Sequence, residues 1–308
     1  MARRRSGEDV HGWVVLDKPV GMTSTEAVAR VKRAFNARKA GHAGTLDPLA
    51  SGLLPVALGE ATKTVPFVMD GMKTYRFTVR WGIEIDTDDA EGEPVAASDQ
   101  RPGAAEIAAA AGAFIGEIEQ VPPAFSAIKV AGERAYDLAR QGAPAALAAR
   151  PARVFSLVHL ESPDADHAVF EAECGKGTYV RALARDMGRK IGCYGHVSAL
   201  RRTRVGPFGE GDMISLEMLD QLRHSAAAPG DRGQFLRPVE TALDDIPALA
   251  ISRSDAARLR RGQAVLVRGR DAPLVQGTVY ATSGGTLVAL GEIERGELHP
   301  KRLFHMAG

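Results

Sequence analysis

The stretch "GHAGTLDPLASGLLPVALGEATK", residues 41–63, places a single aspartate, Asp47, in a run with almost no other charge. An aspartate before a proline commonly begins a helix, with the aspartate as N-cap and the proline at the first helical position. Glycines around Asp47 favour another interpretation, a loop that a large ligand can approach closely. These glycines are Gly41, Gly44, Gly52 and Gly59. The residues alone leave both interpretations open.

His42, five positions before Asp47, is ambiguous in the same way. A lone histidine is usually just held by hydrogen bonds. Beside a glycine loop, however, it can stack on nucleic-acid bases or wedge between them.

The charges of the chain are segregated along the sequence, although the net charge is only +1. Residues 30–39 carry basic side chains and no acid, and residues 181–204 carry basic side chains against Asp186 alone. Residues 84–99 carry seven acids and no base. One charged run is usually a solvated helix face. Together, the two basic runs and the arginines of residues 3–5 predict a groove for a polyanion, and the acidic run predicts a separate surface that repels phosphate.

The composition indicates a globular chain that remains in the cytoplasm. At 308 residues and 45% apolar content, it can form one large core with a smaller module, or two domains. It has no run of 18 apolar residues, and its first fifteen residues lack the apolar core of a signal peptide, so we expect no membrane segment. Cys174 and Cys193 are too few for a disulfide framework and wrongly spaced for zinc, so we expect buried cysteines and no metal site.

Hydrophobic periodicity predicts strands at residues 13–16, 74–83 and 168–174 and helices after residues 24, 104 and 178. Ser24 and Thr178 are the expected N-caps of the first and the last of these helices. In the second strand, alternation places Tyr75, Phe77 and Val79 on one face. A hairpin turn is expected near Gly132. Residues 224–246, rich in Ala, Pro, Gly and Asp, mark a domain boundary, and the short strands beyond it predict a small β-barrel or sandwich.

Several familiar catalytic sites are excluded by spacing. The chain has no GxxxxGK[ST] phosphate loop, no GxSxG nucleophile turn and no HExxH or CxxC pair. What remains is one carboxylate, that of Asp47.

Five segments of the chain resemble, in order and spacing, the TruB family of tRNA pseudouridine synthases. They are "LDKPVGMTS" (16–24), "GHAGTLDPLASGLLPVALGEATK" (41–63), "KTYR" (73–76), "GKGTYVRALARDMG" (175–188) and "LRRTRVGPF" (200–208). The resemblance runs from about residue 10 to the C-terminus, where the last 60 or so residues match a PUA-like RNA-binding module.

This resemblance implies an α+β chain with the pseudouridine synthase fold: a central mixed, mainly antiparallel sheet flanked by helices and loops, followed by a small C-terminal β-barrel of PUA-like type. The expected domains are a disordered basic arm at 1–9, a catalytic domain at 10–243 with an RNA-contacting insertion at 120–150, and the PUA-like domain at 247–308.

The resemblance also implies the reaction, which is isomerisation of uridine to pseudouridine at position 55 in the T loop of tRNA. Breaking the glycosidic bond and re-attaching the base through C5 needs a nucleophile, and the resemblance assigns this role to Asp47. Arg181 can pair with Asp47 and keep it ionised. Because a helix N-terminus disfavours an arginine, its placement there suggests a carboxylate partner.

The other substrate-binding residues follow from the resemblance. Tyr75 is expected to stack on the target base, and Tyr179 and Leu200 to complete the uridine pocket. The uridine must be flipped out of its stack, and His42 is expected to take the vacated space. Lys18, Lys63 and the arginines of residues 181–204 are expected to hold phosphates.

Two alternatives remain beside the enzyme: a non-catalytic RNA-binding or tRNA-folding protein, and a glycosidase, which needs a second catalytic carboxylate that the motifs do not supply. For the enzyme we expect no cofactor, no guide RNA, a monomer and tRNA as partner.

Overall fold

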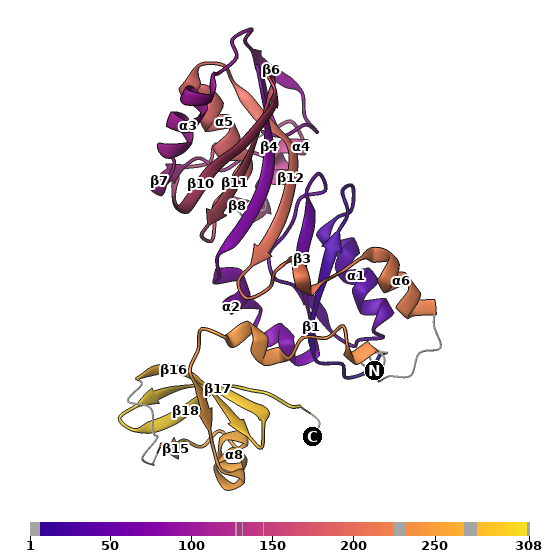
Figure 1. Cartoon of the computed structure of the whole chain (residues 1–308). Coiled ribbons are helices and arrows are strands. Elements are labelled where there is room, and N and C mark those ends of the chain that lie inside the picture. Colours follow the sequence, from indigo (N-terminus) through magenta and orange to yellow (C-terminus); the bar gives the residue numbers. More distant parts are fainter. Residues whose placement is uncertain are drawn as a thin grey trace.

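The structure, a computed structural model, describes residues 7–126, 128–130, 132–143, 145–224, 232–267 and 276–306. A large sheet forms the centre of the molecule (Figure 1), in the order β13-β1-β3-β12-β4-β11-β10-β7, with β2 paired to β3. Its strands are β1 (Gly12–Lys18), β2 (Ala40–His42), β3 (Ser51–Leu58), β4 (Lys73–Trp81), β7 (Gly116–Gln120), β10 (Arg150–Asp164), β11 (His167–Cys174), β12 (Gly195–Val205) and β13 (Met213–Ile214).

The sheet is mixed but mainly antiparallel, as expected. Among the described strands of this large sheet, only the β1–β13 and β3–β12 pairs are parallel. The alternation predicted for residues 74–83 is confirmed, because Phe77 and Val79 are buried in the main core and Tyr75 packs against it. Strand β12 lies between β3 and β4, so it joins the segment that carries Asp47 to the strand that carries Tyr75.

The helices flank this sheet. Helices α3 and α5 pack together and contact β10 and β12 respectively, and α1 and α6 pack at the other end beside β1 (Figure 1). Their bounds are α1 (Ser24–Ala34), α2 (Val65–Asp70), α3 (Ala104–Gly112), α4 (Ala135–Arg140), α5 (Val180–Ile191), α6 (Leu216–His224) and α8 (Arg253–Arg260).

Two of the predicted helix caps are wrong. The N-cap of α1 is Thr23, whose hydroxyl accepts from the amide of Glu26, because the hydroxyl of Ser24 is occupied by the backbone of Leu46. Helix α5 is preceded by Tyr179 as N-cap, and Thr178 donates instead to the carbonyl of Arg153.

Smaller elements lie outside the large sheet. Strands β5 (Ile83–Ile85) and β6 (Pro94–Ala97) form one hairpin. Strands β8 (Lys129–Val130) and β9 (Glu133–Arg134) form another, around the turn predicted near Gly132, and α4 follows it. This second hairpin lies in the predicted insertion at 120–150.

A second sheet, in the order β14-β16-β17-β18-β15, forms the C-terminal part and curls into a half-barrel (Figure 1). Its strands are β14 (Ala248–Ala250), β15 (Val265–Leu266), β16 (Gly277–Ser283), β17 (Thr286–Glu294) and β18 (Glu297–Leu303). Leu287, Leu290 and Phe304 share an apolar cluster with Trp13 and Val15 of β1. The predicted fold class is therefore confirmed, with a curled half-barrel as the small module.

The described part of the predicted N-terminal arm, residues 7–9, is bonded to the rest of the protein. Residues 1–6 lie outside the described residues, but the backbone of Glu8 bonds to Asn36 and Arg38, and Asp9 forms an ion pair with Arg38 at 2.8 Å. The low apolar content of the arm did not reveal these polar contacts.

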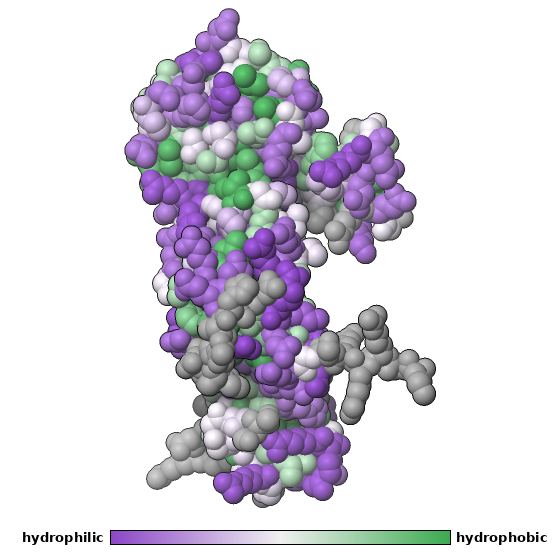
Figure 2. Space-filling model, turned by 90° about the vertical axis from the view of Figure 1, so that its right-hand side faces the viewer, coloured by the Kyte–Doolittle hydropathy of each residue, from purple (hydrophilic) through white to green (hydrophobic). Residues whose placement is uncertain are grey.

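Hydrophilic residues prevail on the face shown in Figure 2, where apolar residues form small separate patches. Among the described helices, none combines the length and the apolar character needed to cross a membrane.

Candidate active site

Asp47 lies in an irregular segment between β2 and β3, so the helix-capping interpretation is wrong. Its carbonyl accepts from the amide of Ala50, which closes a turn at Pro48, and no helix follows. The preceding segment is fixed by Ser24, whose hydroxyl both donates to the carbonyl of Leu46 and accepts from its amide. The carboxylate is consequently free to face a pocket, and the side chain is 40% exposed.

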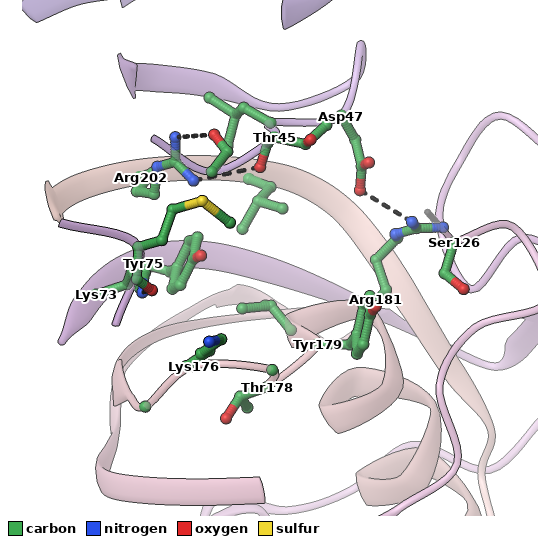
Figure 3. Close-up of a pocket in the computed structure, with 17 residues that line it drawn as sticks. Thr45, Asp47, Lys73, Tyr75, Ser126, Lys176, Thr178, Tyr179, Arg181 and Arg202 are labelled. Atoms are coloured by element: carbon green, nitrogen blue, oxygen red, sulfur yellow. Dashed lines mark hydrogen bonds and ion pairs between the residues drawn. The ribbon is translucent and has the colours of Figure 1, made fainter. Parts of the chain in front are cut away.

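This pocket, of about 280 Å³, is drawn in Figure 3. It is formed by the Asp47 segment, the end of α2, the start of β4, the loop before α5 and the middle of β12. The lining residues are Gly44, Thr45, Leu46, Asp47, Met69, Lys73, Tyr75, Ser126, Gly175, Lys176, Gly177, Thr178, Tyr179, Val180, Arg181, Leu200 and Arg202.

The structure brings Asp47 and Arg181 together. The Arg181 guanidinium lies 2.9 Å from the carboxylate of Asp47 and 3.3 Å from that of Asp89, and its side chain is only 6% exposed. It also donates to the carbonyls of Thr87 and Phe125. Because these contacts leave the guanidinium little freedom, the direction of the Asp47 carboxylate is fixed.

Asp89 is a site residue that the sequence analysis missed, since it was counted with a surface that repels phosphate. The segregated charges in fact meet in the interior. Along α5, Arg181 pairs with Asp89, Arg185 with Asp88 at 2.9 Å and Arg189 with Glu84 at 2.6 Å. The prediction of a separate acidic surface is therefore wrong for these three acids, because burial requires each charge to have a partner. The spacing of the arginines, four residues apart on one helix face, was the available signal.

The pocket also contains the residues expected to surround the uracil. Tyr75 extends from β4, Tyr179 is the residue before α5, and Leu200 is a nearly buried residue of β12. Burial raises the pKa of Tyr75, and the positive charge of Arg202 opposes that rise. Burial likewise raises the pKa of Tyr179. Both phenols therefore hold their protons at neutral pH.

His42 lines a second cavity, of about 290 Å³, that adjoins the pocket at Asp47. Burial lowers the pKa of His42, and the positive charge of Arg202 lowers it further, so the ring is neutral. Its buried Nδ1 has no hydrogen-bond partner within the part of the chain that the structure describes.

The structure contradicts the phosphate-binding role predicted for Lys18. This side chain is fully buried, and its ammonium donates to the carbonyls of Pro19 and Met22. Lys63 does not line the pocket. Its ammonium pairs with Glu60, donates to the carbonyl of Leu303 and lies over the ring of Phe304, against the C-terminal module.

The arginines of residues 181–204 are likewise mostly engaged within the protein. Arg181, Arg185 and Arg202 are buried, and Arg201 pairs with Asp17 and Glu210. The exposed cation at the pocket is Lys176, which forms an ion pair with Asp70. Among the described residues, no three His, Cys, Asp or Glu side chains converge as metal ligands would.

Comparison with known protein families assigns most of the chain. The TruB family pseudouridylate synthase N-terminal domain matches residues 32–180, the tRNA pseudouridylate synthase B C-terminal domain matches 181–244, and the C-terminal domain of pseudouridine synthase II TruB matches 247–304.

Relatives that align with nearly the whole chain support the same family assignment. A tRNA pseudouridine synthase B from Bradyrhizobium diazoefficiens is 65% identical over 99% of this chain and 89% of its own. Another, from Rhizobium johnstonii, is 54% identical over 98% of both chains. A chain in the crystal structure of a Cbf5-Nop10-Gar1 complex is 29% identical, with a TM-score of 0.74 over 96% of this chain and 85% of its own. The chain belongs to the TruB family of pseudouridine synthases.

Proposed function

We propose that this protein isomerises uridine to pseudouridine at position 55 in the T loop of tRNA, with Asp47 as the nucleophile. The observation that carries the proposal is the ion pair between Asp47 and the buried Arg181 at the edge of a pocket that also contains Tyr75. The tRNA substrate follows from the full-length relatives, which are named tRNA pseudouridine synthase B.

The residues suit the bonds that must change. The C1′–N1 bond breaks, a C1′–C5 bond forms, C5 loses a proton and N1 gains one, so no net oxidation occurs and no redox partner is needed. A carboxylate serves as the nucleophile that holds an intermediate while the base turns. The Arg181 guanidinium pairs with the carboxylate of Asp47 and aims it into the pocket.

The target uridine must leave its stack to reach Asp47, at a cost of about a few kcal/mol. We propose that Tyr75 stacks on the flipped uracil while Tyr179 and Leu200 complete its pocket. His42, in the adjoining cavity, takes the vacated place in the loop. A neutral, unpartnered ring suits this role, because it can enter a base stack without desolvating a charge.

The proposed setting is the cytoplasm, with the protein acting as a monomer on tRNA without guide RNA or cofactor. Support for tRNA as the partner comes from the full-length relatives, which are named tRNA pseudouridine synthase B.

The test uses the purified protein and a T stem-loop RNA labelled with tritium at uridine C5. Release of the label reports the isomerisation, and mapping of pseudouridine in the product locates it. Asp47→Asn should abolish release and leave the dissociation constant for the RNA within about threefold of wild type. Asp166→Asn is the matched control, because Asp166 also pairs with an arginine, Arg101, but does not line the pocket.

The same experiment separates the alternatives. A non-catalytic RNA-folding protein predicts no label release by the wild type, and a glycosidase predicts abasic RNA that breaks on mild alkaline treatment. Full activity of Asp47→Asn would remove the nucleophile assignment.

A further inference from the structure

Arg202, on β12, is a buried cation with unusual partners. Arg202 is only 1% exposed, yet no carboxylate among the described residues forms an ion pair with its guanidinium. The guanidinium donates instead to the carbonyls of Leu53 at 2.8 Å, Gly44 at 3.1 Å and Thr45 at 3.3 Å. The other buried arginines of the site, Arg181 and Arg185, each pair with carboxylates.

Such an arrangement is costly, since burying a charge without a counter-charge costs several kcal/mol even when it is hydrogen-bonded. An apolar side chain would pack between the strands more cheaply. Packing between the strands does not by itself explain why a buried charge is present here, so we expect Arg202 to have a further role.

The position of Arg202 suggests that role. It faces Gly52 on β3 and Tyr75 on β4, so it joins the strands on either side of β12. Two of its carbonyl partners, Gly44 and Thr45, lie three and two residues before Asp47 in the chain. Figure 3 shows these contacts on the other side of the Asp47 segment from Arg181.

Arg202 also lies beside Tyr75, because the two residues are partners on the neighbouring strands β12 and β4, and both line the pocket. The positive charge of Arg202 opposes the rise in the Tyr75 pKa that burial causes. A single guanidinium is thus bonded to the segment that leads to Asp47 and lies next to an aromatic residue of the same pocket.

We propose that Arg202 is a positioning residue for the isomerisation: it holds the Asp47 segment in place against β12, next to Tyr75, with a permanent positive charge beside the pocket. This inference rests on the proposed function. When the C1′–N1 bond breaks, its electron pair stays with the base, so the detached uracil is anionic until C5 bonds to C1′; C5 then loses its proton and N1 gains one. A fixed buried cation stabilises that charge without reorganisation.

The test compares Arg202→Lys, which keeps the charge, with Arg202→Met, which removes it. We expect kcat to fall on the order of 100-fold in the Met variant, because a small misplacement of a catalytic group has an effect of that size. The fall should be smaller in the Lys variant. We expect KM and the dissociation constant for the T stem-loop to stay within about threefold of wild type. Arg76→Met is the control, since Arg76 follows Tyr75 on β4 but is exposed on the opposite face.

A double-mutant cycle with Tyr75→Phe tests whether Arg202 acts through the phenol. If it does, the effects of Arg202→Lys and Tyr75→Phe on kcat are less than multiplicative. The double-mutant cycle uses Arg202→Lys and not Arg202→Met, so it tests the proposal even if the Met variant fails to fold. Thermal melting would reveal such a failure.

Three outcomes overturn the inference: unchanged kcat in both variants, a loss confined to KM and melting temperature, or fully multiplicative effects in the cycle. Failure of the proposed function looks different, because the wild type itself would then release no label.

Discussion

At the scale of single residues, burial decides what a charged side chain can do. Lys18 was expected to hold a phosphate, yet its ammonium group is buried and bonded to backbone carbonyls, and the ammonium of Lys73 is bonded in the same way. Burial lowers the pKa of each to about 8. Each imposes a cost on the fold while it carries its charge.

This cost makes the stability depend on pH. Because the folded-state pKa of Lys18 lies near 8 and its ordinary value is 10.5, the unfolded chain binds more protons between these limits. The free energy of unfolding should therefore rise with pH across that window, by on the order of 2 kcal/mol for this residue. Urea unfolding at pH 7.5 and pH 9.5 measures the rise.

Lys18→Met should show a smaller rise than wild type over the same pH interval, while Lys73, titrating in the same window, contributes equally to both proteins. An identical rise in the two proteins would mean that Lys18 does not titrate there.

At the scale of elements, the site depends on how closely strands approach. Gly52 on β3 has φ +98°, and a Cβ there would lie 2.3 Å from the carbonyl oxygen of Arg202. Only glycine allows the parallel β3–β12 contact that joins the Asp47 segment to β12. The sequence showed the glycine but not the strand that approaches it.

Gly52→Ala should therefore destabilise the protein by more than about 2 kcal/mol, since backbone strain and a backbone clash combine. Gly209→Ala is the control, because that glycine has an ordinary negative φ and open space around its Cα. The midpoints of urea unfolding measure the stability of both variants relative to wild type. Equal midpoints for the two variants would show that the strands can move apart at little cost.

Other elements were predictable because their signal is local. Periodicity identified the strand of Tyr75, the helix after residue 104 and the hairpin near Gly132. The N-cap of α1 was not predictable from local sequence, because Ser24 and Thr23 are both good N-cap residues. The distant Leu46 decides between them by bonding to the hydroxyl of Ser24.

At the scale of the whole molecule, most of the basic residues that line the pocket are buried and one, Lys176, is exposed to RNA. Lys176, at the pocket, has a 63% exposed side chain and only a surface ion pair with Asp70. Such a pair is worth at most about 1 kcal/mol, so a phosphate can replace it easily. Lys63 instead bridges the larger sheet and the C-terminal module.

Binding of the T stem-loop should therefore weaken steeply as salt rises, because each phosphate contact releases counterions. Lys176→Gln should lower the slope of log Kd against log salt by about 1, whereas Lys63→Gln should leave it unchanged. Fluorescence anisotropy at several salt concentrations measures these slopes. A reduced slope for Lys63→Gln would restore the phosphate contact that the sequence suggested.

The sequence by itself determined the family, the α+β class, the candidate nucleophile and most elements near it, because these depend on motifs and on periods of two or about four residues. Only the tertiary structure decided which charges meet: Asp89 with Arg181, Asp88 with Arg185, and Arg202 with backbone carbonyls. Partners far apart in the chain leave no local pattern. Burial, which makes an unpaired charge expensive, selects them only once the strands and helices have packed.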